Sequence, residues 1–309
     1  MRSKPLALAA KLAVSAVLVG FLVKRYGGEP AFRAAFLRLD PASFLLAEAL
    51  IGFGLVLSAL RWLALLRARG VTLGFGSAVR LYFVGYFFNL FLPTTVGGDV
   101  ARALGAAGAA PMPILAGVIL VERIVGFGCL LAVGIAASYG SPQLGLVRPS
   151  LWIAAAVYVA GVLALVAIPS AWETTGKGRR WLGGLLRTAQ QVRAYGFHPA
   201  AVSAAIVLSL GWQLALALAN AALAKGLGGV APLGSLLALI PVIQAVGMIP
   251  VSFGGLGVRE MGYEFFFRQS GFDPAGAVAL AACFLGVTIS VALVGGVLYL
   301  VYPFRGRAT

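Results

Sequence analysis

Long apolar runs alternate with short polar connections along this chain of 309 residues. Six runs reach the length of about 20 residues that a helix needs to cross the hydrocarbon of a bilayer. They cover 6–23, 44–66, 114–138, 151–168, 200–224 and 275–302, and the last two contain no charged residue. The pattern predicts an all-α, polytopic transmembrane helical bundle with these six segments as spans.

Two further apolar stretches are too short or too interrupted for ordinary spans. The run 81–92 ends at Pro93, and the run 233–251 contains Pro241, Gly247 and Pro250. Both lead into glycine-rich turns. Irregular backbone at membrane depth is tolerated where protein shields it or where it lines a wet cavity. We therefore expect two re-entrant or broken helices.

The longest polar connection, 170–199, divides the chain. Its apolar residues, including Ala189 and Val192, recur at helical spacing, while Arg180, Arg187 and Gln191 fall on the opposite face. This pattern predicts an amphipathic interfacial helix on the cytoplasmic side. We expect a single integral membrane domain, 1–309, with a first half of about 1–169, this linker, and a second half of about 200–309. The distribution of basic residues favours both termini inside a cell (inner, cytoplasmic) membrane.

Composition excludes several classes of protein. Hydrophobic residues make up 61% of the chain and charged residues 11%, too few charges for a water-facing surface. The net charge of +15 comes mostly from loops between apolar runs, which favours anionic lipid headgroups over nucleic acid as the partner. Two separated cysteines and one histidine make no pattern for a metal site, so we expect neither a metal nor a cofactor.

An internal repeat is the most informative feature. LPTTVGGDVARAL at 92–104 and IPVSFGGLGVREM at 249–261 both read P-x3-G-G-x3-R, and all four positions are offset by 157 residues. Each copy follows one of the two broken apolar stretches. Paired broken helices in halves of opposite topology point to a transport site near the membrane midplane. The expected architecture is therefore an inverted repeat.

The repeated residues suit an anion. Paired glycines let backbone N–H groups converge, a following helix adds its positive end, and arginine offers a fork that matches phosphate. The alternative is a pair of tight turns between packed helices, with the arginines reaching to headgroups at the surface. On the first interpretation, the residues that bind the lipid phosphate are Gly97, Gly98, Arg102, Gly254, Gly255 and Arg259.

Four further charged residues are candidates for the polar wall of a cavity: Asp99, Glu122, Arg123 and Glu260. Asp99 could cap the helix that follows it, or it could pair with an arginine or couple an ion. Glu122 and Arg123 are adjacent in an apolar span and point in different directions, so each needs a partner elsewhere. They are either functional or an interhelical ion pair. Arg61 lies near the end of a span, where we expect it to reach to the surface.

The motifs GGDVAR and FGGLGVRE, together with VER in a later span, resemble the transmembrane region of lysylphosphatidylglycerol synthases, a flippase-like family. The resemblance covers essentially the whole chain. It implies movement of aminoacylated phosphatidylglycerol, or of hopanoid- or polyprenol-linked lipids, between leaflets. It implies that the glycines and arginines of both repeats, with Glu122, Arg123 and Glu260, line the cavity. The acid that often stands three residues after the arginine of the ER pair is replaced here by Gly126.

The sequence thus predicts translocation of a phosphate-bearing lipid, without the soluble aminoacyl-transferring domain of full synthases. Two alternatives remain. One is a membrane transferase that acts on a polyprenyl-phosphate sugar, which would need a carboxylate as base. The other is a non-catalytic membrane partner of a lipid-synthesis enzyme, recruited through the 170–199 helix.

Overall fold

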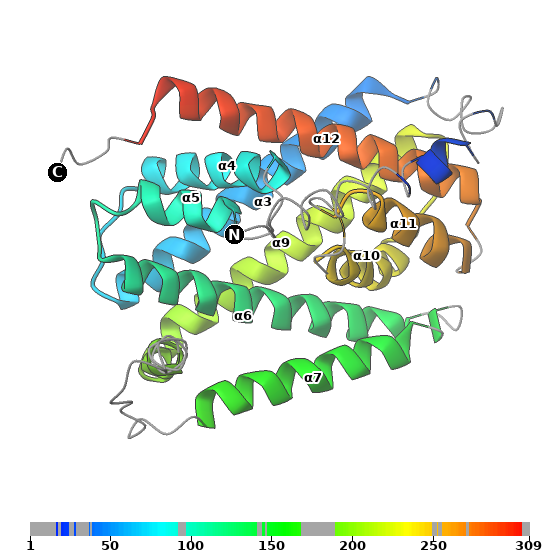
Figure 1. Ribbon diagram of the computed structural model, residues 1–309. Helices are drawn as coiled ribbons and strands as arrows, with labels where there is room; N and C mark the ends of the chain where they lie inside the picture. Colours follow the sequence, from blue (N-terminus) through cyan, green and yellow to red (C-terminus); the bar gives the residue numbers. More distant parts are fainter. Residues whose placement is uncertain are drawn as a thin grey trace.

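The structure is a computed structural model. It describes residues 17, 20–24, 28, 37, 39–91, 97–140, 144–145, 147–167, 189–248, 252, 255–269 and 272–304. All regular secondary structure in this part of the chain is helical (Figure 1). The helices are α3 (Pro41–Ala68), α4 (Phe75–Phe91), α5 (Gly97–Gly105), α6 (Met112–Ser138), α7 (Arg148–Ala167), the short 3-10 helix η3 (Tyr195–Phe197), α9 (Pro199–Gly226), α10 (Leu233–Gly247), α11 (Val258–Gln269) and α12 (Pro274–Val301).

Five of these helices are long and apolar enough to cross a membrane: α3, α6, α7, α9 and α12. They correspond to five of the six predicted spans. The sixth, 6–23, falls largely outside the described residues. The two broken stretches form the shorter helices α4 and α10, each followed by a short helix. The all-α membrane bundle is confirmed, whereas the re-entrant depth of α4 and α10 stays a prediction.

Two of the 28-residue helices, α3 and α12, begin at an Asp-Pro step. The carboxylate of Asp40 accepts from the amides of Ala42 and Ser43 at the start of α3. The carboxylate of Asp273 accepts from the amide of Gly276 at the start of α12. Each acid satisfies amides that have no partner within the helix, and the proline that follows suits the first helical position.

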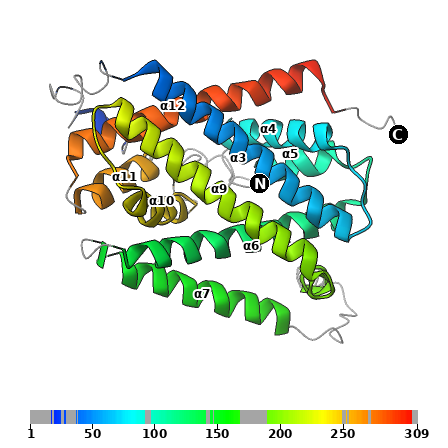
Figure 2. The same ribbon diagram turned by 180° about the vertical axis from the view of Figure 1, so that it is seen from behind.

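Helices α3 and α9 lie side by side and antiparallel across one face of the bundle (Figure 2). The amide of Asp40, before α3, donates to the carbonyl of Gly226 at the end of α9 (3.1 Å). At the other end, the hydroxyl of Tyr195 donates to the carbonyl of Leu65 (2.9 Å). Each helix has 28 residues, so the pair is matched over its whole length.

Each repeat motif begins the second arm of a helical hairpin. In the first hairpin, α5 runs back along α4, so that Gly98 lies against Gly85 and Gly105 against Leu81. In the second, α11 runs back along α10, with Gly255 against Gly247 and Gly262 against Ile243. A Cβ at Gly98 would lie 2.0 Å from the carbonyl oxygen of Gly85, so this approach of two backbones requires glycine.

The molecule contains two matching sets of elements. The first is α3, the hairpin α4/α5, and α6; the second is α9, the hairpin α10/α11, and α12. Each hairpin packs against the last helix of the other set, α4 against α12 and α10 against α6. Because α3 and α9 are antiparallel, and α6 and α12 run in opposite directions in Figure 1, the sets are related as an inverted repeat.

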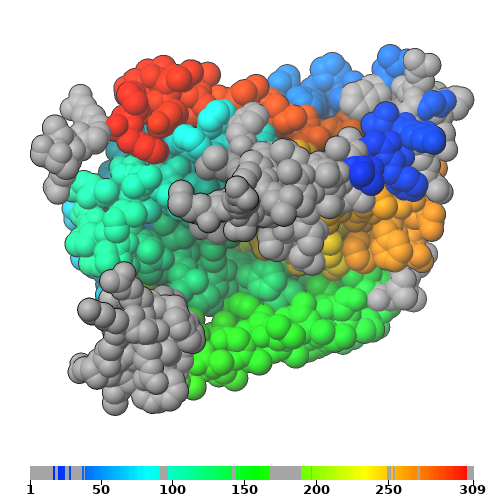
Figure 3. Space-filling view, viewed as in Figure 1, coloured from blue at the N-terminus to red at the C-terminus, as the bar shows by residue number. Residues whose placement is uncertain are grey.

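Helix α7 lies outside this symmetric core and forms one edge of the molecule (Figure 3). It packs on α6, and most of its apolar side chains are exposed. Much of the 170–199 linker, including Arg180 and Arg187, is outside the described residues. Its last part is helical, with Ala189 buried as predicted. Gln191 is half-buried: its amide oxygen accepts from Arg69 (2.9 Å), and its side chain lies against Gly117, while its place on a water-facing side of the linker helix stays a prediction.

Candidate functional site

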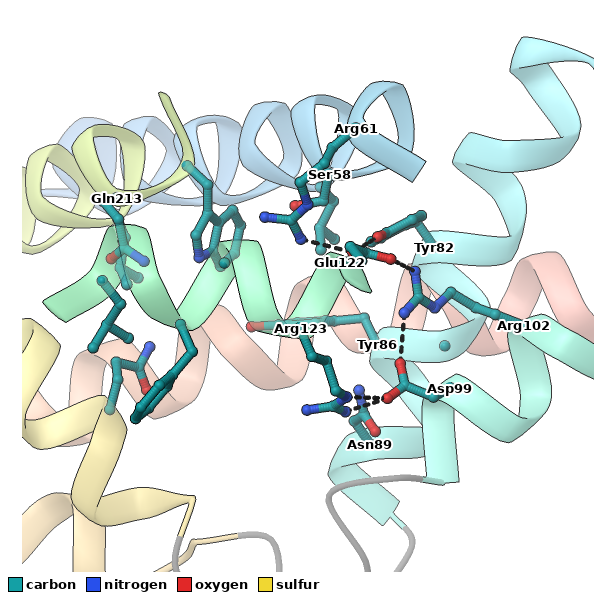
Figure 4. A pocket seen from close by; sticks show the side chains of 18 of the residues that line it. Ser58, Arg61, Tyr82, Tyr86, Asn89, Asp99, Arg102, Glu122, Arg123 and Gln213 are labelled. Carbon is teal, nitrogen blue, oxygen red and sulfur yellow. Dashed lines mark hydrogen bonds and ion pairs between the residues drawn. The ribbon is translucent and has the colours of Figure 1, made fainter. Parts of the chain in front are cut away.

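A cavity of about 440 Å³ lies where the two halves meet. This volume is within the roughly 300–1,000 Å³ typical of small-molecule sites. Helices α3, α4, α5 and α6 of the first half form its charged end, and α9 and α10 of the second half close the other end (Figure 4). The lining comprises Leu55, Ser58, Arg61, Tyr82, Gly85, Tyr86, Asn89, Asp99, Arg102, Glu122, Arg123, Gly126, Phe127, Leu130, Trp212, Gln213, Leu216, Gln244 and Met248.

Five of the lining residues form an alternating series of ion pairs, which we call the charge chain. Its members, in order, are Arg61, Glu122, Arg102, Asp99 and Arg123, and Figure 4 shows the links. Three elements contribute: α3, α5 and α6. The chain begins and ends with arginine, so its three cations exceed its two carboxylates by one positive charge.

Glu122 lies at the centre of the buried part of the charge chain. It accepts from Arg61 (2.7 Å) and from Arg102 (3.1 Å), and the hydroxyl of Tyr82 donates to it as well. Arg61 also donates to the hydroxyl of Ser209 on α9 (2.9 Å). The prediction that Arg61 reaches to the membrane surface was wrong. Its side chain turns inward because the carboxylate of Glu122 provides an opposite charge inside the bundle.

Arg102 is buried and held from several sides. Its two terminal nitrogens donate to Glu122 and to Asp99 (2.5 Å), and its guanidinium lies 4.2 Å from the ring centroid of Tyr82. Trp62 lies on the same guanidinium at 5.3 Å. A buried cation with two carboxylates and two aromatic faces does not reach headgroups at the surface. The snorkelling alternative is therefore wrong for Arg102.

The buried Asp99 links the exposed end of the charge chain, Arg123, to Arg102. Helix α5 already begins at Gly97, so Asp99 lies in its first turn and pairs with Arg102 and Arg123 instead of capping the helix. The Arg123 side chain is 41% exposed, against 7% for Arg102. Of the three arginines in the charge chain, Arg123 is the one that an incoming ligand can reach most easily.

Uncharged polar groups line the cavity away from the charge chain. Gln213 of α9 is only 5% exposed, and Figure 4 places it far from Asp99 and Arg102. Its amide has no hydrogen-bond partner among the described residues, although it lines the cavity. Trp212 and Gln244 also contribute to the lining. One end of the cavity is thus ionic and the other presents neutral hydrogen-bonding groups and an aromatic ring.

The second repeat motif has a different environment. Arg259 pairs with the adjacent Glu260 (3.3 Å), and its guanidinium lies 5.5 Å from the ring centroid of Phe284. The other carboxylate oxygen of Glu260 accepts from the amide of Gly257 (2.7 Å). Neither Arg259 nor Glu260 belongs to the cavity lining. Tyr86, which does line it, is close enough to Arg259 for an electrostatic interaction.

The predicted site residues therefore separate into two groups. Asp99, Arg102, Glu122 and Arg123 meet at one cavity, whereas Arg259 and Glu260 lie apart from its wall. Gly97 and Gly98 are buried at the start of α5, and Gly255 adopts a positive φ of 80° beside Gly247. Gly254 lies outside the described residues. Binding of a lipid phosphate by these glycines and arginines stays a prediction.

Sequence reasoning missed several residues of the cavity. Tyr82, Asn89 and Gln213 were not singled out, although each is a polar side chain within an apolar helix. That property was the available signal, because polar groups at membrane depth need a partner or a function. Among the described residues, no group of three or more metal-ligating side chains is found.

The model of the family described as the lysylphosphatidylglycerol synthase TM region matches residues 8–296. The chain belongs to this family. The match covers both hairpins, the charge chain and all five candidate spans except the end of α12. A lysylphosphatidylglycerol synthase TM region is a membrane-embedded, lipid-related module, and the chain is accordingly a multi-pass membrane protein. A search of curated proteins found no significant match.

Proposed function

We propose that the protein moves a phosphate-bearing lipid between the two leaflets of the membrane. The observation that carries the proposal is the charge chain, which leaves one net positive charge on the wall of a cavity between two inverted halves. A phosphodiester carries one negative charge and accepts the paired hydrogen bonds that guanidinium groups offer. The headgroup would occupy the cavity while the acyl or prenyl tails stay in lipid.

Arg123 is the residue that we assign to first contact with the phosphate. It is the most exposed arginine of the charge chain, and Asp99 holds its guanidinium at the cavity wall. An incoming phosphate would share Arg123 with Asp99. The inverted arrangement of α3–α6 and α9–α12 supports alternating access, because two related packings of the halves can open the same site to opposite sides.

The charge chain argues against the transferase alternative. A general base must be free to accept a proton. Asp99 and Glu122, the two carboxylates of the cavity, each contact two arginines, and Glu122 also accepts from Tyr82. Carboxylates that are each held by two arginines are not free to approach a proton on a substrate.

Translocation can be measured in proteoliposomes that contain phosphatidylglycerol with a fluorescent acyl chain. The rate at which the label becomes accessible to an impermeant quencher reports movement between leaflets. Arg123→Ala should slow this rate roughly tenfold to a hundredfold, because one charge-assisted phosphate contact is lost. Arg123→Lys should retain part of the activity, since the charge remains but the fork is lost.

Arg268→Ala is the matched control. Arg268 also pairs with a carboxylate, that of Glu264, but it lies on α11 outside the cavity lining. Its replacement should leave the rate unchanged. A wild-type rate in Arg123→Ala would instead support the second alternative, a membrane partner whose arginines are dispensable, and would reject the phosphate site.

A further inference from the structure

We propose that the cavity selects a lipid phosphate whose headgroup is uncharged and carries hydroxyl groups, and that it disfavours a cationic, aminoacylated headgroup. This inference rests on the proposed translocation and narrows its substrate class. The charges and the hydrogen-bonding groups of the cavity wall support it.

The charge balance of the wall disfavours a cationic headgroup. Three arginines and two carboxylates are the charged residues of the lining. A phosphodiester cancels the excess positive charge. A lysyl ester of the same phospholipid adds two ammonium groups, so that the complex would again hold excess positive charge in a confined space. Like charges in such surroundings strongly disfavour a ligand.

The carboxylates of the cavity are already occupied. Asp99 pairs with Arg102 and Arg123, and Glu122 pairs with Arg61 and Arg102. An ammonium group that entered would have to displace an arginine from one of them. Displacement would leave that arginine uncompensated at membrane depth, which is costly. No other acidic side chain among the described residues belongs to the lining.

The end of the cavity away from the charge chain fits hydroxyl groups. The residue Gln213 is nine-tenths buried and lines the cavity, and no hydrogen bond joins its amide to another of the described residues, although its amide atoms are not among the fully buried atoms without a partner. A buried amide without partners is unfavourable unless a ligand or water satisfies it. An amide can donate to one hydroxyl and accept from another. Trp212, the preceding residue of α9, also lines the cavity, and its ring packs against Gly54 of α3.

The experiment compares three lipids with the same fluorescent acyl chain in proteoliposomes: phosphatidylglycerol, its lysyl ester, and phosphatidic acid, which has no headgroup hydroxyl on carbon. Phosphatidylglycerol should move about tenfold faster than the lysyl ester, the discrimination expected when a site rejects a charge that it cannot pair. Equal rates for the two, or a faster lysyl ester, would overturn the inference while leaving translocation itself intact.

The variant Gln213→Leu tests the role of the neutral end. It should slow phosphatidylglycerol by about tenfold, the effect of losing a hydrogen bond to a substrate hydroxyl, and leave phosphatidic acid at its wild-type rate. Gln269→Leu, an exposed glutamine at the end of α11, is the control and should alter neither rate. Equal slowing of both lipids in Gln213→Leu would show that the amide serves the structure and not the headgroup.

Binding separates failure of this inference from failure of the proposed function. Short-chain dihexanoyl phosphatidylglycerol and its lysyl ester can be titrated calorimetrically into the purified protein in detergent. If no lipid moves between leaflets but phosphatidylglycerol still binds about tenfold more tightly, translocation is wrong and the selectivity stands. If neither lipid binds, the selectivity is wrong as well.

Discussion

The two hairpins share one motif and one backbone arrangement but differ in electrostatic environment. In both, a glycine at the start of the second arm lies against the first arm, and an arginine follows. Arg102 contacts two carboxylates from two helices and lines the cavity. Arg259 contacts the carboxylate of its own neighbour and has a buried Nε without a partner among the described residues.

This difference shows that the repeat preserves the turn and not the ion pairs. The first hairpin gains its chemistry from residues that the second lacks. Where the first has Asp99, the second has Leu256, and α12 carries no counterpart to Glu122 and Arg123. We infer that the first half supplies the charged wall, and that the second half supplies the neutral wall through α9 and α10.

The largest difference that we expect between the two hairpins is in how much each arginine contributes to the stability of the protein. Arg102→Ala leaves Asp99 and Glu122 each with one arginine fewer inside the bundle. Breaking a buried ion pair costs about 3–5 kcal/mol, and Arg102 takes part in two such pairs; among the described residues Arg259 takes part in one, whose carboxylate still accepts from the amide of Gly257. Arg102→Ala should therefore lower the thermal unfolding midpoint in detergent far more than Arg259→Ala.

A double variant sharpens this prediction. Replacing Arg102 and Asp99 together by apolar residues of similar size should give no recovery, because Arg102→Ala leaves Arg61 with Glu122 and Arg123 with Asp99, whereas the double change also removes the carboxylate that Arg123 contacts. Equal shifts of the unfolding midpoint in Arg102→Ala and Arg259→Ala would mean that the two hairpins are electrostatically alike, against the contacts described above.

The next effect concerns the glycines. Gly98→Ala would place its Cβ 2.0 Å from a backbone oxygen of α4, which cannot rotate away, so α5 must move off α4. Overpacking of this kind costs about 1–3 kcal/mol. Gly255→Ala meets a looser contact of 2.9 Å, but its φ of 80° adds about 1–2 kcal/mol of backbone strain.

The two glycine variants should therefore both destabilise the protein, with different effects on the cavity. Gly98→Ala should also reduce lipid translocation, because α5 carries Asp99 and Arg102, whereas Gly255→Ala should reduce it less. Gly108→Ala, with open space around its Cβ, is the control and should behave as wild type in size-exclusion chromatography and transport. A Gly98→Ala protein with unaltered transport would contradict the close packing of the first hairpin.

The sequence was sufficient for the long helices, because runs of about 20 apolar residues have few other stable arrangements. The repeat was sufficient to locate two broken apolar stretches that are each followed by a glycine-containing turn and a further helix, but it did not predict that this helix packs back along the first. The sequence did not predict the ion pairs of Glu122 with Arg102 and Arg61. These pairs join residues 20 and 61 positions apart, and they depend on which face each helix turns toward its neighbours. Arg61 illustrates the point: its position near a span end favoured the surface, yet Glu122 draws it inward.

The smallest effect on stability is expected at Asn89 in the first hairpin, where two substitutions separate the loss of a hydrogen bond from a change of charge. The side-chain oxygen of Asn89 accepts from the amide of Gly98 (2.8 Å), at the place where the repeat puts Val246 in the second hairpin. Asn89→Val removes that bond and should cost about 1 kcal/mol. Asn89→Asp keeps an acceptor oxygen, so its unfolding midpoint should stay near that of wild type.

The same Asn89→Asp change adds one negative charge to the cavity wall, beside Arg123 in Figure 4. The three arginines of the lining would then face three carboxylates, and the excess positive charge would be gone. If that excess charge draws the lipid phosphate in, Asn89→Asp should bind dihexanoyl phosphatidylglycerol about tenfold more weakly than Asn89→Val, although it is the more stable protein. Calorimetric titration of both variants measures the ratio. Tighter binding by Asn89→Asp would show that the hydrogen bond to Gly98, and not the net charge of the wall, determines the affinity for the lipid. The charge difference between the two hairpins would then have no part in lipid binding.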